Sequence, residues 1–138
     1  MPANHQPVLP ITYRMSQPVS NDDLNHLFVT AWPDHHATDF EPILRRSLTY
    51  VCAYAQTTLV GFVNVAWDGG IHAFLLDTTV HVEWQRQGIG RQLVHHAIAT
   101  ARAHGIHWLH VDYEAHLDTF YRSCGFEPTL AGLIRLNE

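Results

Sequence analysis

Two glycines between two arginines mark a stretch of the sequence that is suited to binding an anion. The segment QRQGIGR, residues 85–91, places Gly88 and Gly90 between Arg86 and Arg91, where an apolar extended segment runs into a long helical pattern. Glycine is costly inside a helix but costs little just before one. The first amides of a helix lack internal partners, and the helix dipole adds positive charge there. The segment therefore predicts a phosphate-binding turn, to which the arginines add charge-assisted contacts.

Two common nucleotide-binding motifs do not fit this turn. A nucleotide P-loop requires glycine, four residues and then glycine-lysine-serine/threonine, which the sequence lacks. A dinucleotide-binding turn requires a third glycine, and Leu93 stands at that position. The phosphate is therefore expected to belong to another class of ligand.

Histidine is the other residue type whose abundance suggests chemistry. The chain has 12 histidines, and they are dense at His35-His36, at His95-His96 and in the run His104, His107 and His110. A zinc site needs three or four ligands at short fixed spacings, often with cysteines. These spacings are diffuse, and neither Cys52 nor Cys124 lies near a histidine cluster. No metal is predicted, although a histidine-dependent metal protein, which a chelator would destabilise, stays open as an alternative.

Length and composition predict one globular domain over residues 1–138, with residues 1–7 as a loose arm. Hydrophobic residues make up 46% of the 138 residues and charged residues 15%. The net charge of −5, without a basic run, argues against nucleic acid as a partner. No apolar run approaches the ~18 residues that span a bilayer, so no membrane partner is expected. Two cysteines without a secretory signal are expected to be free, in a cytoplasmic protein.

Periodicity predicts the elements that position the turn. We expect a strand at 11–15, a helix at 21–31 after the N-cap Ser20, and a short helix after Asp39 with Pro42 in its first turn. The rest of the chain is expected to form strands at 50–54, 59–67 and 71–82, a helix at 89–104, a strand at 107–112, a helix at 116–124, and extended segments at 126–129 and 132–136. The order β-α-α-β-β-β-α-β-α-β-β predicts an α/β (α+β) fold: a central mixed, mostly antiparallel sheet with helices on both faces.

Two motifs in this order resemble those of the GNAT superfamily of N-acetyltransferases. Gln85-x-x-Gly88-x-Gly90 is similar to the superfamily's Q/R-x-x-G-x-G/A motif, which binds the pyrophosphate of acetyl-coenzyme A. Residues 120–126, FYRSCGF, resemble its F-Y-x-x-x-G-F signature. The resemblance covers residues 8–136 by element order and 73–127 by motif. It implies the acyl-CoA N-acyltransferase fold, with acetyl-CoA as cosubstrate.

The resemblance also implies which residues hold the cofactor. The backbone around Val80 and Val82 would bind the pantetheine arm as if it were an added strand. This requires the strand at 107–112 to splay away, usually at a bulge. The implied cofactor-binding residues are Val80, Val82, Gln85, Arg86, Gln87, Gly88, Ile89, Gly90 and Arg91.

The implied reaction is direct attack of a neutral amine on the thioester, so a base or a water chain must take the proton of the amine. Tyr121 matches the superfamily tyrosine that protonates or hydrogen-bonds the departing thiolate, although it could also only shape the acyl pocket. Some members carry a glutamate or histidine base on the fourth strand, but Phe74 stands at that position here. His72, which shares the strand parity of Phe74, is one substitute. Asp112 and Glu114, acting through water, and the histidines of the 32–36 loop are others.

The acceptor site is expected to be lined by the loop after the first helix, the turn after the third strand and the segment after the splayed strand. Its expected residues are Trp32, His35, His36, Trp67 and Asp112. Tryptophan and acidic groups suit a cationic amine, on a small polyamine-like or aminoglycoside-like molecule or on a protein. Superfamily members often dimerise through sheet ends or late strands, so a homodimer is one expectation. A non-catalytic acyl-CoA sensor on the same fold is the main alternative.

Overall fold

The structure is a computed structural model that describes residues 9–137, so the predicted arm at 1–7 lies outside the described residues. The elements in chain order are β1 Ile11–Met15, α1 Asn21–Ala31, α2 Glu41–Arg46, β2 Ser47–Ala55, β3 Thr58–Trp67, β4 His72–Val80, the 3₁₀ turn η1 Val82–Trp84, α3 Ile89–Ala103, β5 Trp108–His110, the 3₁₀ turn η2 Ala115–Leu117 and α4 Asp118–Ser123.

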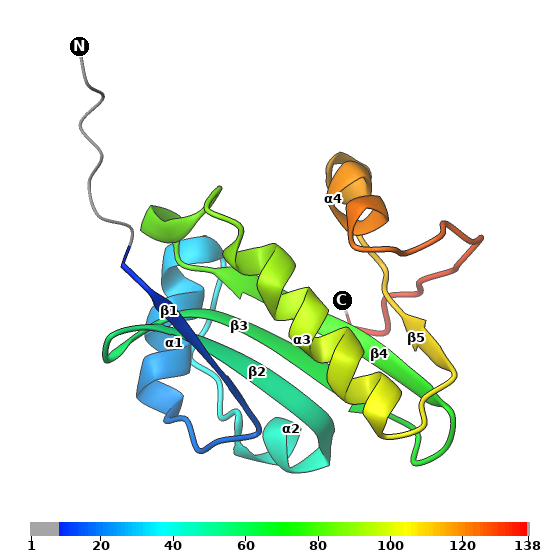
Figure 1. Cartoon of the computed structure of the whole chain (residues 1–138), viewed down its shortest axis with the longest axis horizontal. Helices are drawn as coiled ribbons and strands as arrows, with labels where there is room; N and C mark the ends of the chain where they lie inside the picture. Colours follow the sequence, from blue (N-terminus) through cyan, green and yellow to red (C-terminus); the bar gives the residue numbers. More distant parts are fainter. Residues whose placement is uncertain (1–8, 138) are drawn as a thin grey trace.

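The sheet has the order β1-β2-β3-β4-β5. The first four strands pair antiparallel, and β5 pairs parallel with β4 after the crossover through α3. Helix α3 lies across one face of the sheet, and α1 and α2 cover part of the other (Figure 1). The predicted mixed, mostly antiparallel sheet with helices on both faces is therefore confirmed.

Strand β3 is the centre of this arrangement because both of its faces are apolar. Val63 and Val65 pack in the cluster with α3, and Phe62 packs in the cluster with α1. All three side chains are buried, as predicted for a strand covered on both faces. The sheet is packed between these two layers of helices, and this packing positions the ends of its strands.

The long helices begin and end close to where their sequence patterns predict. The hydroxyl of Ser20 accepts a hydrogen bond of 3.1 Å from the amide of Asp23, which caps the first turn of α1. Leu24 and Leu27 of α1, and Leu93 of α3, are fully buried against the sheet. An amphipathic stripe of this kind is what places each helix on its face.

Strand β4 is shorter than predicted at its carboxyl end. It ends at Val80, whereas the apolar pattern predicts extended structure to residue 82. His81 ends the strand because its Nδ1 accepts a hydrogen bond of 3.1 Å from the amide of Glu83, which caps η1. Val82 therefore lies in a 3₁₀ turn with its side chain 54% exposed.

The two elements that follow α3 are also shorter than predicted. Strand β5 has only three residues, where the sequence predicts a strand over 107–112. The helix predicted at 116–124 is divided between η2 and α4. Because β5 is short, it holds only one end of β4.

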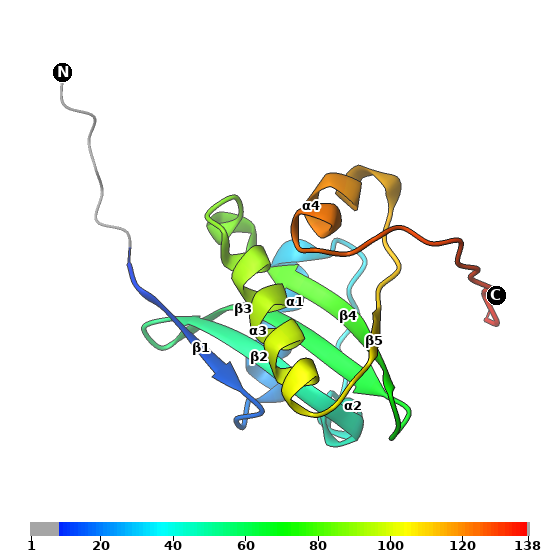
Figure 2. The same ribbon diagram turned by 45° about the vertical axis from the view of Figure 1, so that its right-hand side comes forward.

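The two predicted final strands are wrong. Residues 126–137 contain no strand, and after α4 the chain runs away from the sheet (Figure 2). Leu130, Leu133, Ile134 and Leu136 are between 80% and 106% exposed. An extended segment becomes a strand only where a neighbour satisfies its backbone, and no described part of the chain pairs with this one.

Gly61 of β3 lies where α3 comes closest to the sheet, and it supplies a test of this packing. A Cβ at Gly61 would lie 2.9 Å from Leu93 Cδ1, 3.1 Å from Ile89 Cγ2 and 3.2 Å from Ala53 Cβ. We expect Gly61→Ala to lower the free energy of unfolding by about 1–3 kcal/mol, measured by urea denaturation, because the added methyl overpacks the core. Gly132→Ala, in open space, is the control. Equal stability of the two variants would contradict the close packing.

Candidate functional site

The turn before α3 is held open by two residues with left-handed backbone. Arg86 has φ of 64° and Gly88, the N-cap of α3, has φ of 84°. The side chain of Gln85 donates a 3.1 Å hydrogen bond to the carbonyl of Val80, which ties the turn to the end of β4. No side chain caps the first amides of the 15-residue helix α3. These amides are therefore available to an anion, as the glycine pattern requires.

The start of α3 also lies close against α4 and β4. Ile89 is only 2% exposed and anchors the first turn in the core. A Cβ on Gly90 would touch Phe120 Cζ at 3.5 Å and Val80 Cγ2 at 3.6 Å, so the glycine lets these elements approach. The guanidinium of Arg91 donates a 3.1 Å hydrogen bond to the carbonyl of Ser123 at the end of α4. Arg91, predicted to contact phosphate, thus joins α3 to α4 here, whereas Arg86 and Gln87 are exposed.

One edge of β4 lacks a neighbouring strand along most of its length. The pairing with β5 covers only His72, Ala73 and Phe74. From residue 75 to residue 80, β4 pairs with β3 on one side and, among residues 9–137, with no strand on the other. The predicted splay of the two strands is therefore confirmed, and it leaves an open hydrogen-bonding edge that leads to the α3 turn.

A β-bulge interrupts β4 along this open edge. Thr79 pairs with Phe62 and Leu76 pairs with Asn64, so that two residues of β4 stand opposite the single residue between them on β3. The two bulged residues are Asp77, whose φ of 58° is left-handed, and Thr78. A bulge redirects the side chains next to it, and this one separates two neighbouring threonines.

The two threonines connect the bulge to opposite sides of the sheet. On one side, the hydroxyl of Tyr121 from α4 lies 3.3 Å from Thr78 Oγ1 and donates to it. On the other side, the indole N–H of Trp32, at the end of α1, donates a 3.0 Å hydrogen bond to Thr79 Oγ1. Thr79 Oγ1 in turn donates to the carbonyl of Asp77 at 2.8 Å. Tyr121 and Trp32, two predicted site residues that are distant in sequence, therefore contact neighbouring residues of β4 from opposite sides of the sheet.

Tyr121 is positioned by a cluster of aromatic rings. Its ring stacks on Tyr113 with the centroids 4.7 Å apart and meets Phe120 and Phe126 edge-on. Burial raises the pKa of Tyr121, and the hydrogen bond to Thr78 opposes part of this rise. The hydroxyl therefore keeps its proton at neutral pH, as a proton donor beside the open edge of β4 must.

The loop after α1 is ordered by side-chain contacts. His35 Nε2 lies 2.7 Å from Asn25 Oδ1, and its ring packs against Phe28 and Phe40. His36 is exposed in the same loop. The loop therefore reaches the bulge through Trp32, while His35 serves to hold it in place.

Two other predicted residues lie at the far end of β4. His72 is the first residue of the strand, and Trp67 pairs with its second residue. His72 and Thr78 are six residue steps apart along the strand, which is about 20 Å. His72 Nδ1 instead lies 2.8 Å from His110 Nε2. The structure does not bring His72 or Trp67 together with Tyr121.

The two predicted acids after β5 differ in their surroundings. Burial is the main cause of the raised pKa of Tyr121, and the charge of Asp112 adds to the rise. Glu114 pairs at 3.4 Å with His116, and both side chains are largely exposed. Asp112 therefore belongs to the surroundings of Tyr121, and Glu114 to the surface.

Sequence reasoning missed Asp77, which lies between the residues that the bulge brings together. The available signal was a single acid in the otherwise uncharged segment AFLLDTTV, residues 73–80. Asp77 is accessible to solvent, yet burial among surrounding protein atoms raises the pKa of its carboxyl. Within residues 9–137 its carboxylate has neither a hydrogen-bond nor an ion-pair partner.

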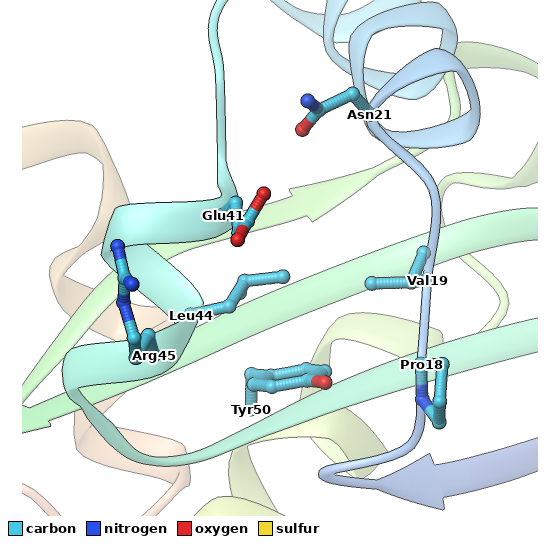
Figure 3. Close-up of a pocket in the computed structure, with 7 residues that line it drawn as sticks. All are labelled: Pro18, Val19, Asn21, Glu41, Leu44, Arg45 and Tyr50. Atoms are coloured by element: carbon cyan, nitrogen blue, oxygen red, sulfur yellow. The ribbon is translucent and has the colours of Figure 1, made fainter.

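A hollow of about 510 Å³ lies elsewhere on the molecule (Figure 3). It is lined by Pro18, Val19, Asn21, Glu41, Leu44, Arg45 and Tyr50. These residues surround the start of α1, whereas Trp32 follows the end of that helix. No predicted site residue lines this hollow, so its size alone does not make it the candidate site.

Within residues 9–137, no three histidine, cysteine or acidic side chains are grouped to hold a metal ion. No helix in this part of the chain is both long and apolar enough to cross a membrane. Cys52 and Cys124 are free and buried, and burial raises the pKa of Cys52 to about 12. Such a thiol is an inert core residue.

Comparison with known proteins agrees with this geometry. The sequence model of the Acetyltransferase (GNAT) family matches residues 20–126. The chain belongs to this family of acyltransferases, which confirms the predicted superfamily and enzyme class.

Individual relatives extend over different parts of the chain. An uncharacterized N-acetyltransferase, ycf52, of Porphyra purpurea is 32% identical over 72 residues, which are 52% of this chain and 41% of that protein. The chain thus spans less than half of this relative. The GNAT family protein SP0256 of Streptococcus pneumoniae has 29% identity and a TM-score of 0.74, over 93% of this chain and 98% of that one. The aminoglycoside acetyltransferase AAC(6')-Iy, solved with a bisubstrate analogue, shares the fold at 19% identity and a TM-score of 0.75, over 94% and 99% of the two chains.

The contact between Tyr121 and Thr78 can be tested by tyrosine titration. We expect Thr78→Val to raise the pKa of Tyr121 further, because the Thr78 hydroxyl can turn to donate a hydrogen bond to the phenolate, which lowers this pKa. The measurement is NMR of ring-labelled tyrosine against pH. Thr79→Val is the matched control, since Thr79 binds Trp32 on the other side of the sheet. An equal shift in the pKa of Tyr121 in both variants, or no shift in either, would contradict the described contact.

Proposed function

We propose that the protein transfers an acetyl group from acetyl-CoA to a primary amine, by direct attack in a ternary complex. The observation that carries this proposal is the open edge of β4, which runs from the last β5 pair to the uncapped start of α3. An extended arm that ends in a phosphate matches this edge and helix start, because the edge offers backbone groups and the helix offers amides.

The cofactor would use most of the residues implied by the glycine motif. The backbone near Val80 would bind the arm, and the amides of residues 87–91 would bind the pyrophosphate. The backbone N–H of Val82 already donates to Thr30 Oγ1 at 3.3 Å, so Val82 has a weaker claim than Val80. Arg86 and Gln87, being exposed, are the side chains free to contact phosphate, together with the amides beside Gly88.

The chemistry would proceed beside Tyr121. A neutral amine attacks the thioester carbonyl, the C–N bond forms, and the C–S bond breaks. The phenolic hydroxyl of Tyr121 then protonates the thiolate, which its raised pKa and its place at the open edge support. The roles of His72 and Glu114 as bases have less support, since one lies far along β4 and the other pairs on the surface.

The acceptor would approach from the side of Trp32. Trp32, which contacts the bulge at Thr79, and the exposed imidazole of His36 in the same loop offer groups on this side, and an aromatic ring suits a cationic amine. Asp112, on the Tyr121 side, would add a carboxylate. AAC(6')-Iy, which was solved with a CoA-acetylneamine analogue, supports amines of this class, although a protein amino group fits the same chemistry. A non-catalytic sensor finds no support among these relatives. A cytoplasmic location stays a prediction, consistent with two free thiols.

Acetyl-CoA binding, measured by titration calorimetry, tests the cofactor site. We expect Gly88→Glu to lose at least about two orders of magnitude in affinity, because the carboxylate repels the pyrophosphate at the helix start. Gly105→Glu is the matched control. Both glycines have positive φ and open surroundings, but Gly105 lies at the other end of α3.

Turnover completes this test of function. The wild type should release free thiol from acetyl-CoA with at least one member of a panel that holds sisomicin, spermidine and a lysine peptide. Wild-type binding without any turnover would favour the sensor. Equal affinities of the two glutamate variants for acetyl-CoA would contradict a cofactor site at the α3 turn.

We also propose that the protein forms a homodimer, which the C-terminal segment at residues 130–136 supports. Four exposed aliphatic side chains in residues 130–136 are more than a monomeric surface ordinarily leaves without a partner. We expect the wild type to sediment as a dimer and the double variant Ile134→Glu, Leu136→Glu to sediment as a monomer. Arg135→Glu, on the same segment, should remain a dimer. A monomeric wild type would exclude this assembly.

A further inference from the structure

The bulge of β4 holds a carboxylate whose role the proposed function has not used. Asp77 lies next to Thr78 in the chain, and neighbouring Cα atoms are about 3.8 Å apart. Thr78 receives the hydroxyl of Tyr121, the proposed proton donor to the thiolate. The backbone carbonyl of Asp77 receives the hydroxyl of Thr79, which also binds Trp32. The backbone of Asp77 therefore adjoins the contact of Tyr121 on one side of the sheet and the contact of Trp32 on the other.

The left-handed backbone of Asp77 is a local cost that the fold maintains. A non-glycine residue with φ of 58° inside a strand is uncommon. Strained conformations of this kind persist where the surrounding structure holds them, and they cluster at functional sites. Here the strain accompanies the bulge, which sets Asp77 and Thr78 together opposite Val63.

The electrostatic surroundings of Asp77 are those of a proton acceptor. Its carboxylate is accessible to solvent and has no partner within residues 9–137. Of the elements around the bulge, α4 brings Tyr121, the segment after β5 brings Asp112, and α1 brings Trp32, which does not titrate. None of them brings a cation within ion-pair distance of Asp77. Desolvation is the cause of its raised pKa, and a carboxylate with a raised pKa is a better base near neutral pH.

We propose that Asp77 binds the ammonium group of the acceptor and takes its proton. This inference rests on the proposed acetyl transfer and names the base that sequence analysis left open. The amine nitrogen gives up two protons in the reaction. The first passes to Asp77 and then to water. The second is lost after attack and replaces the proton that Tyr121 gives to the sulfur, so that acetyl-CoA and the ammonium yield the amide, free coenzyme A and one released proton.

Asp77→Asn is the variant that isolates the charge. Asparagine is among the residues that best tolerate a left-handed backbone, so the bulge is retained. The raised pKa means that the folded state binds this proton more tightly than the unfolded state. The contribution of Asp77 to stability is therefore largest at low pH and is lost as pH rises through the pKa of this carboxyl in the folded state. At neutral pH the variant should be at least as stable as the wild type, whereas a structural role for the carboxylate predicts a loss.

The kinetic test compares wild type, Asp77→Asn and the control Asp22→Asn, with the best amine of the panel and with hydroxylamine, which is uncharged at neutral pH. We expect Asp77→Asn to lose about 10²- to 10⁴-fold in kcat/KM for the amine, with unchanged calorimetric affinity for acetyl-CoA. The loss should be much smaller with hydroxylamine. The wild-type kcat/KM should fall at low pH as Asp77 is protonated, and this limb should disappear in the variant.

The outcomes separate the two proposals. Asp22 is exposed in the first turn of α1, away from the bulge, so Asp22→Asn should match the wild type. An active wild type matched by Asp77→Asn, or an equal loss with both nucleophiles, would overturn the role of Asp77 alone. A wild type that binds acetyl-CoA but acetylates neither nucleophile would overturn the proposed function itself.

Discussion

The departure of β5 from β4 is the constraint on which the rest of the site depends. After Phe74 the two strands no longer pair, and the backbone of β4 from residue 75 to residue 80 keeps one edge without a strand. A buried backbone group without a partner costs about 1–3 kcal/mol, so such an edge is stable only where solvent or a ligand reaches it. Helix α4 packs against the start of α3 and reaches this edge through the hydrogen bond between Tyr121 and Thr78.

The bulge uses this freedom to place chemistry on both sides of one strand. Without the extra residue, Thr78 and Thr79 would continue the regular alternation from Leu76, and their contacts would exchange faces. With it, Thr78 meets Tyr121 and Thr79 meets Trp32. The bulge requires a left-handed backbone at Asp77. It brings the carboxylate of Asp77 and the contacts of Tyr121 and Trp32 into three consecutive residues of β4. Local irregularity in β4, rather than a deep cavity, is what defines the candidate site.

Sequence patterns predicted those parts of the fold whose stability is local. Helix α1 was predicted to the residue because Ser20 caps it and its apolar side chains repeat at helical spacing. The glycine turn was predicted because only a few residue types adopt the backbone of Gly88. Tyr121 was placed in the last helix by its motif, and its role as a proton donor stays a prediction.

Features set by distant contacts were not predictable in the same way. The segment at 132–136 was predicted to be extended, but it finds no neighbouring strand within the described chain. Val82 continues an apolar pattern, yet the side chain of His81 turns the backbone there. Asp77 was missed because a bulge depends on the register between β3 and β4, which a single sequence does not reveal. His72 shares a parity with the expected base position but lies at the wrong end of the strand.

Amide exchange with and without acetyl-CoA tests the central claim most directly. If the cosubstrate binds as an added strand with its pyrophosphate on α3, its addition should protect amides of residues 75–80 and 87–91 from hydrogen exchange in the full-length wild type. The hollow that contains Tyr50 should be unaffected. Protection at that hollow, with none along β4, would show that the open edge is not the cofactor site and would contradict the account.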